Sequence, residues 1–193
     1  MTMYHDMDGI DGYLTEEAHV LAQVPRPPIA RIVQLLSDAR RQGKRILIFG
    51  NGGSAATASH FVVDIVKGTL IDRADEKQPR FKAICLSDSV PTLTAVANDF
   101  SYDRVFSEPL ASLAQPGDIA IAISGSGNSP NVLKAIEVAR EMGLATVGLT
   151  GGSGGKLKDL VDICVVVPST SMQLIEDTHL VILHAIFVEL CRA

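Results

Sequence analysis

Two short segments rich in glycine and serine carry the residue types that bind phosphate. Residues 50–54 read Gly-Asn-Gly-Gly-Ser and residues 124–129 read Ser-Gly-Ser-Gly-Asn-Ser. Each follows an apolar run, at 45–49 and 119–123, and precedes a helical pattern. Backbone N–H groups at a helix start, beside small hydroxyl side chains, can bind an anion without a nearby arginine. The pair of segments therefore predicts a phosphorylated small molecule as ligand.

Helix capping is the alternative explanation for these serines. Ser54 and Ser129 stand where N-cap residues are expected, and Pro130 follows at the favoured first helical position. Each segment also has surplus glycine, and the second adds Ser124 and Ser126. A cap needs only one of these residues, so the surplus favours phosphate binding.

Two nucleotide-binding motifs are matched only in part. Residues 50–55 fit a loose dinucleotide fingerprint, but Asp72 falls in a polar loop and no acidic residue ends the next strand. Residues 151–156 resemble a P-loop that is one residue short, and Leu157 replaces the hydroxyl residue that would hold magnesium. We therefore expect no nucleotide site and interpret 151–156 as a tight turn.

Two histidine and carboxylate pairs could perform proton transfer. His60 and Asp64 are four residues apart on one helical pattern, and Glu176 and His184 are eight apart on the last. An imidazole and a carboxylate beside a sugar can move the protons that shift a carbonyl along its chain. The same four side chains could hold zinc, which would polarise that carbonyl. A buried structural histidine is equally compatible with the spacing.

Asn98 and Asp99 follow an apolar, helix-like stretch at 91–97. Both residue types suit a turn that ends a helix. They also suit contact with sugar hydroxyls, and this interpretation depends on the other motifs.

The elements that must position these residues alternate between strand-like and helix-like patterns. Apolar runs typical of buried parallel strands occur at 45–49, 82–86, 118–123, 145–149 and 162–167. Helical patterns occur at 54–67, 103–114, 130–142 and 171–190. This order predicts an α/β fold with a single doubly wound, five-stranded parallel sheet, flanked by helices in three layers as in flavodoxin.

Both ends of the chain add helical segments to this sheet. Two helical patterns come first, separated by a proline-rich break at 25–28. We therefore divide the chain into an N-terminal helical arm at 1–26 and the main domain at 27–193. The last helix is apolar nearly all round over 180–191, which indicates burial, for example in an interface between copies.

The composition limits the environment and the partners of the chain. Its net charge is −5 without a lysine and arginine cluster, so we expect no nucleic-acid partner. The apolar runs are too short to span a membrane, and residues 1–12 do not resemble a signal peptide. The three cysteines are far apart in apolar stretches, which favours a reducing cytoplasm.

Taken together, these residues resemble the SIS (sugar isomerase) domain family, and within it the phosphoheptose isomerases. The resemblance covers most of the chain. Its carriers are the segment 50–54, His60 with Asp64, Asn98-Asp99, the segment 124–129, and Glu176 with His184.

The resemblance implies an aldose–ketose isomerase that forms an enediol, acts on sedoheptulose 7-phosphate and makes D-glycero-D-manno-heptose 7-phosphate. It implies Asp64 as base and His184 as acid. The implied zinc ligands are His60, Asp64, Glu176 and His184. The implied substrate-binding residues are Asn51, Gly52, Gly53, Ser54, Asn98, Asp99, Ser124, Gly125, Ser126, Ser129 and Glu176. It also implies a homotetramer whose sites take residues from neighbouring subunits.

The chain departs from the family pattern in three places. Asp64 stands where glutamate is usual, Glu176 where glutamine is usual, and Gly125 where threonine is common. An isomerase of another sugar phosphate is one alternative. A non-catalytic SIS protein, which binds a sugar phosphate or a replication-initiation partner, is another. Because that last class lacks the acid and base residues, their presence here favours an enzyme.

Overall fold

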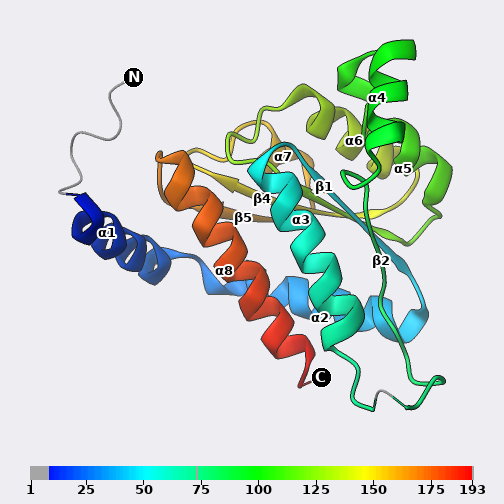
Figure 1. Ribbon diagram of the computed structural model, residues 1–193, viewed down its shortest axis with the longest axis horizontal. Coiled ribbons are helices and arrows are strands. Elements are labelled where there is room, and N and C mark those ends of the chain that lie inside the picture. The colour runs from blue at the N-terminus through cyan, green and yellow to red at the C-terminus, as the bar shows by residue number, and fades with distance from the viewer. Residues whose placement is uncertain (1–8, 73, 193) are drawn as a thin grey trace.

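The computed structural model describes residues 9–72 and 74–192, and a parallel β-sheet lies at its centre (Figure 1). Within these residues the sheet has five strands in the order β2-β1-β3-β4-β5. Every neighbouring pair is parallel. The strands are β1 (Arg45–Gly50), β2 (Lys82–Cys85), β3 (Ile119–Ile123), β4 (Ala145–Gly151) and β5 (Ile163–Val167). This confirms the predicted doubly wound sheet.

Helices cover both faces of the sheet, which gives the three layers (Figure 1). One face packs against α2 (Arg26–Gln42), α3 (Gly53–Val63) and α8 (Met172–Leu190). The other packs against α5 (Ser107–Leu113), α6 (Pro130–Glu141) and α7 (Leu157–Leu160). Because successive residues of a strand point to opposite faces, strands between two helical layers must be apolar throughout.

The alternation of residues along the central strands separates two hydrophobic cores. In β1, Ile46 and Ile48 belong to the core under α3 and α8, whereas Leu47 and Phe49 belong to the core under α6. In β3, residues 119–123 alternate isoleucine and alanine, and the alanines face the α6 side. The small alanine side chains allow α6 to lie close to the sheet.

The N-terminal helix α1 (Gly9–Gln23) packs against α8. The Tyr13 hydroxyl donates to Asp177 at 2.6 Å, and the Thr178 hydroxyl donates to Glu17 at 3.1 Å. The division into an arm at 1–26 and a domain at 27–193 stays a prediction. Among the described residues, no helix has both the length and the apolar character needed to cross a membrane.

Two helical predictions need correction. The helix predicted at 103–114 is interrupted, because η2 (Tyr102–Arg104) ends before Val105 and Phe106, which turn into the core, and α5 follows. The helix predicted at 54–67 is α-helical only to Val63 and then continues as the π-helix η1 (Asp64–Gly68). Between β2 and η2, α4 (Val90–Asp99) projects from the domain and buries none of its residues (Figure 1).

Candidate active site

The two serine-rich segments meet at the C-terminal ends of β1 and β3. These strands are neighbours, and Gly50 pairs in register with Ile123 just before the two segments begin. The chain leaves β1 towards one edge of the sheet and leaves β3 towards the other. Open α/β sheets bind ligands in the crevice at such a switch in strand order. The fold thus brings both segments to the position where a ligand is expected.

A cavity of about 150 Å³ lies between the two segments. Ser54 and Ser124 are buried, and the Ser124 and Ser129 hydroxyl oxygens lie 3.2 Å apart. The cavity is lined by Asn51, Ser54, Ile123, Ser124, Gly125, Ser126, Ser129, Met172 and Glu176. Its polar lining comes mostly from hydroxyl and amide groups, which suits an oxyanion.

Helix capping does not account for the hydroxyls in this cavity. The N-cap residue of α3 is Gly52, so Ser54 lies inside the first turn. Ser129 is the N-cap residue of α6, but its side chain makes no capping hydrogen bond. The Ser126 hydroxyl accepts from the backbone N–H of Asn128 at 3.2 Å and still has its own hydrogen to donate.

Two glycines allow α8 to approach the cavity closely. A Cβ atom at Gly53 would lie 2.6 Å from a carboxylate oxygen of Glu176. A Cβ atom at Gly125 would lie 2.4 Å from the sulfur of Met172. The space that a threonine side chain would take at position 125 is therefore occupied by Met172 in this chain.

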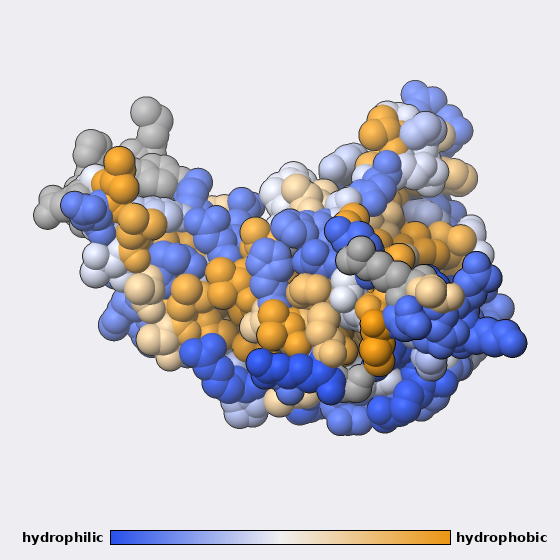
Figure 2. Space-filling view, turned by 60° about the horizontal axis from the view of Figure 1, so that its bottom comes forward, coloured by the Kyte–Doolittle hydropathy of each residue, from blue (hydrophilic) through white to orange (hydrophobic). Residues whose placement is uncertain are grey.

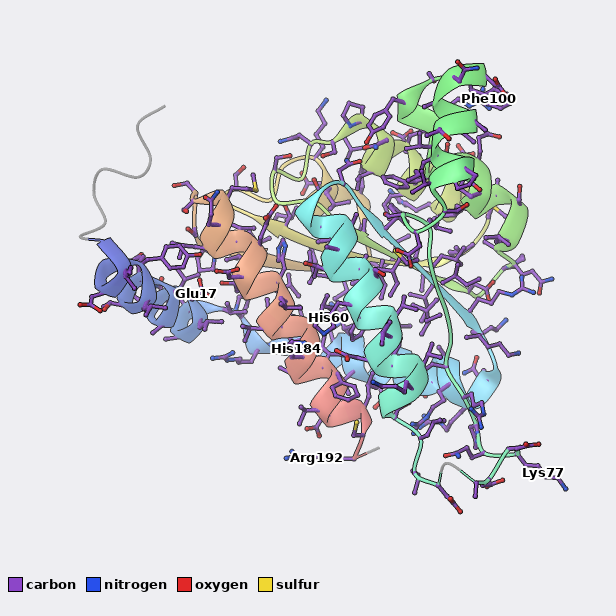
Figure 3. The ribbon with its side chains drawn as sticks, in the orientation of Figure 1. Glu17, His60, Lys77, Phe100, His184 and Arg192 are labelled. Atoms are coloured by element: carbon purple, nitrogen blue, oxygen red, sulfur yellow. The ribbon has the colours of Figure 1, made fainter. Side chains whose placement is uncertain are left out.

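A second group of polar side chains lies between α3 and α8. The His60 and His184 side chains point toward each other from these two helices (Figure 3). Their Nε2 atoms are 3.3 Å apart, and the rings meet edge to face with centroids 4.9 Å apart. Asp64, the first residue of η1, places a carboxylate oxygen 3.6 Å from Nε2 of His60 and 3.5 Å from Nε2 of His184.

These three side chains have the donor set of a divalent metal site. Two imidazole nitrogens and one carboxylate oxygen lie within 4.8 Å of one another. Zinc accepts nitrogen and oxygen ligands of this kind, and catalytic zinc commonly has three protein ligands. The residues present therefore fit the metal that the sequence analysis expects.

The remaining expected site residues lie apart from this cluster. Glu176 lines the phosphate-sized cavity, eight residues before His184 on α8. That spacing corresponds to about 12 Å along a helix. Asn98 and Asp99 are exposed at the end of α4, where the Asn98 amide donates to Asp99 at 2.8 Å. Their roles in substrate or metal binding stay predictions.

The SIS domain family model matches residues 12–151 of the chain. Phosphoheptose isomerase from Paramagnetospirillum magneticum is 42% identical over 180 residues, which cover 92% of this chain and 91% of that protein. A phosphoheptose isomerase structure from Francisella tularensis has 30% identity and a TM-score of 0.87, covering 96% of this chain and 98% of that one. The corresponding structure from Neisseria gonorrhoeae has 28% identity and a TM-score of 0.87, with coverages of 95% and 97%.

The chain belongs to the phosphoheptose isomerase family. The relatives confirm the resemblance that the motifs suggest, because similarity extends over nearly the whole chain in sequence and in structure. A probable phosphoheptose isomerase from Thermoplasma acidophilum is also 39% identical, over 90% of this chain and 93% of that protein.

Two residues that the sequence analysis did not place in the site of this phosphoheptose isomerase family member, Asn131 and Tyr102, lie next to it. Asn131 and Tyr102 both hydrogen-bond Asn51, which lines the cavity. Buried His179 has its Nε2 atom 3.2 Å from the Thr150 carbonyl oxygen, and burial lowers the pKa of its imidazole to about 4. Asn131 occupies an ordinary first-turn position of a helix, so sequence pattern alone gave no signal for it.

Proposed function

We propose that this chain interconverts sedoheptulose 7-phosphate and D-glycero-D-manno-heptose 7-phosphate through an enediol. The observation that carries the proposal is the pairing of a hydroxyl-rich cavity with a separate cluster of two histidines and one carboxylate, with α3 and α8 contributing residues to both. The cavity would hold the phosphate, and the cluster would act on the carbonyl end of the sugar. The similarity to phosphoheptose isomerases supports the same substrate.

The distance between the two groups supports a long sugar. His60 lies seven residues after Gly53 on α3, and His184 lies eight residues after Glu176 on α8. These spacings correspond to about 10 and 12 Å along the helix axes. An extended seven-carbon sugar phosphate has a comparable length, whereas a five-carbon sugar phosphate is two carbon–carbon bonds shorter.

The reaction needs one proton moved between carbons and one between oxygens. Asp64 would remove a proton from C1 of the ketose and return it to C2, since a carboxylate oxygen can serve as base and then as acid. His184 would transfer a proton from the C1 hydroxyl to the oxygen on C2, which accounts for the second of the two proton movements. Together with His60, these residues would hold a zinc ion, which when bound polarises the carbonyl.

The binding residues would orient the substrate for these transfers. Ser54, Ser124, Ser126 and Ser129 would donate hydrogen bonds to the phosphate, each contributing about 1.5–3 kcal/mol because the acceptor is charged. Asn51, Gly52, Gly53 and Gly125 would contribute to the site through an amide group and closely approaching backbone.

A shared site in a homotetramer would explain the residues that lie apart. Asn98 and Asp99 project on α4, and a neighbouring copy could receive them at its own sugar site. Glu176 is about two helical turns from the His60, Asp64 and His184 cluster. Within one copy Glu176 lines the cavity and would contact the substrate there, and its expected role as a metal ligand stays a prediction.

Turnover of sugar phosphates of different lengths tests the proposed function. Purified protein supplemented with zinc is incubated with sedoheptulose 7-phosphate or with a pentulose 5-phosphate, and aldose phosphate signals are followed by NMR. We expect product from the heptulose and at least about tenfold less from the pentulose, because the shorter sugar cannot span both groups. His184→Ala should form no product. Faster turnover of the pentulose, or no product from either, would overturn the proposed substrate.

A further inference from the structure

Asn131 lies behind the cavity and is bonded to a residue that lines it. Its side chain is buried, at 2% exposure, in the first turn of α6. The Asn51 amide donates to Asn131 Oδ1 at 2.9 Å, and the Asn131 amide donates to Asn51 Oδ1 at 2.8 Å. This reciprocal pair joins the loop after β1 to the start of α6, which follows the second serine segment.

A backbone group fixes which way the Asn131 amide faces. The backbone N–H of Val132 donates to Asn131 Oδ1 at 3.0 Å. Because a backbone N–H can only donate, the oxygen of Asn131 must face it, and the NH₂ group must then face Asn51. If the Asn51 amide were reversed, its NH₂ group would face the NH₂ group of Asn131, and its oxygen would face the oxygen of Asn131.

The orientation of Asn51 follows from that of Asn131. Asn51 Oδ1 accepts from Asn131 and also from the Tyr102 hydroxyl at 3.1 Å. Asn51 Nδ2 uses one of its two hydrogens in the bond to Asn131. No hydrogen bond among the described residues uses the second hydrogen, and Asn51 lines the cavity beside Ser54 and Ser124.

We propose that Asn131 is a positioning residue, which holds Asn51 so that an amide N–H, and not the amide oxygen, serves the bound sugar phosphate. This inference rests on the proposed function for the identity of the ligand. A reversed Asn51 would turn an oxygen with lone pairs toward a ligand that presents oxygen atoms. The bonds from Asn131 therefore make Asn51 a donor toward the cavity before any ligand arrives, which avoids the cost of reorienting Asn51 on binding.

A double-mutant cycle between Asn131 and Asn51 tests this role. Asn131→Ala should raise KM for sedoheptulose 7-phosphate about tenfold, the expected value of one hydrogen bond to a charged group, and change kcat by less than about threefold. In an Asn51→Ala background, the same substitution should change KM by less than about twofold, because its effect passes through Asn51. An equal rise in KM in both backgrounds would overturn the proposal, since a purely structural effect would not need Asn51.

Asn131→Asp is the second variant, and it protects the test against misfolding of the alanine variant. Aspartate keeps the acceptor for the Val132 N–H but cannot donate to Asn51 Oδ1. The Asn51→Ala background again separates the positioning effect from the effect of the added charge. We expect Asn131→Asp to raise KM at least tenfold with Asn51 present, and by a clearly smaller factor without it. Equal factors would contradict the proposal.

A measurement on the ligand-free protein separates this inference from the proposed function. In the wild-type ¹H–¹⁵N spectrum, the Asn51 side-chain NH₂ group should show slowed hydrogen exchange. In Asn131→Ala its exchange rate should rise at least about tenfold. This loss of protection would support the positioning role whether or not the wild type turns over sedoheptulose 7-phosphate. Absence of that turnover would contradict only the proposed function. Unchanged protection in Asn131→Ala would overturn the positioning role whatever the substrate.

Discussion

Residues outside the lining of the cavity also shape this molecule, and His179 is one of them. It lies in the middle of α8, buried, with Nε2 facing the Thr150 carbonyl oxygen at the end of β4. Its Nδ1 atom is buried and has no hydrogen-bond partner among the residues that the structure describes. Removal from water disfavours the charged imidazolium and lowers the pKa from 6.5 to about 4. His179 is therefore uncharged at neutral pH in the folded chain.

The buried His179 makes stability depend on pH. Between about pH 6.5 and 4, the unfolded chain binds a proton at this residue and the folded chain does not. Stability therefore falls as the pH falls through this range, by about 3 kcal/mol in total. Urea unfolding at pH 7 and pH 4.5 measures the loss.

His179→Gln is the control for this prediction, because glutamine keeps a side-chain N–H and does not titrate. The stability of the variant should fall less between the two pH values. Burial raises the pKa of the Glu17 carboxyl, which acts in the opposite direction in both proteins and so cancels in the comparison. Identical pH dependence in the two proteins would contradict the assignment.

At the scale of elements, α8 connects the two halves of the proposed site. It carries Met172 and Glu176 at the cavity and His184 at the metal-type cluster. Its position against the sheet depends on Gly151, the last residue of β4. A Cβ atom there would lie 2.4 to 2.9 Å from the side-chain carbons of buried Ile175.

Gly151→Ala should therefore displace α8. Overpacking of this kind costs about 1–3 kcal/mol of unfolding free energy. We also expect at least about tenfold lower kcat/KM, because a misplacement near 1 Å costs about 100-fold in rate. Adding Ile175→Ala makes room for the new methyl group, so the double variant should be more stable than the sum of the single effects predicts. Strict additivity would show that this contact does not set the position of α8.

The elements also show what sequence pattern could predict. The strand positions are correct within two residues, because buried parallel strands must be apolar on both faces and β1 to β5 all show such runs. The π-helical turn at Asp64 and the four-residue α7 were missed, since neither is long enough to display a period. The predicted metal set of His60, Asp64, Glu176 and His184 is brought together only in part, because Glu176 lies at the cavity, and the roles of all four stay predictions. Sequence pattern gives no sign of Asn131 behind Asn51.

The whole molecule has apolar surface that a single copy leaves exposed. Figure 2 shows apolar residues gathered over a broad area of the visible face. On α3 and α8, Val63, Val181 and Val188 are 52%, 43% and 49% exposed. Phe100 and Tyr102, next to the projecting α4, are more exposed still. Contiguous exposed apolar residues mark interaction surfaces, which supports the proposed association of copies.

Charged substitutions on α8 test that association. We expect the wild type to sediment as a tetramer, and Val181→Lys with Val188→Lys to sediment at lower mass, because a lysine amine is costly to bury between copies. Leu113→Lys is the matched control, since Leu113 is also an exposed apolar residue but lies on α5, on the opposite face of the sheet. Unchanged mass in the α8 variant would place the interface elsewhere.

The most direct test of the central claim follows solvent deuterium during the reaction. Zinc-supplemented protein is incubated with sedoheptulose 7-phosphate in deuterated water, and NMR reports deuterium at C2 of the aldose product. The proposed enediol reaction predicts aldoheptose phosphate labelled at C2, with both product and label lost in Asp64→Ala and His184→Ala. If Asp64 is shielded from solvent, it returns the substrate's own proton and the product carries no deuterium. In that case the turnover of Asp64→Ala is the deciding measurement. Undiminished turnover in Asp64→Ala and His184→Ala would contradict the assignment of this cluster as the catalytic centre.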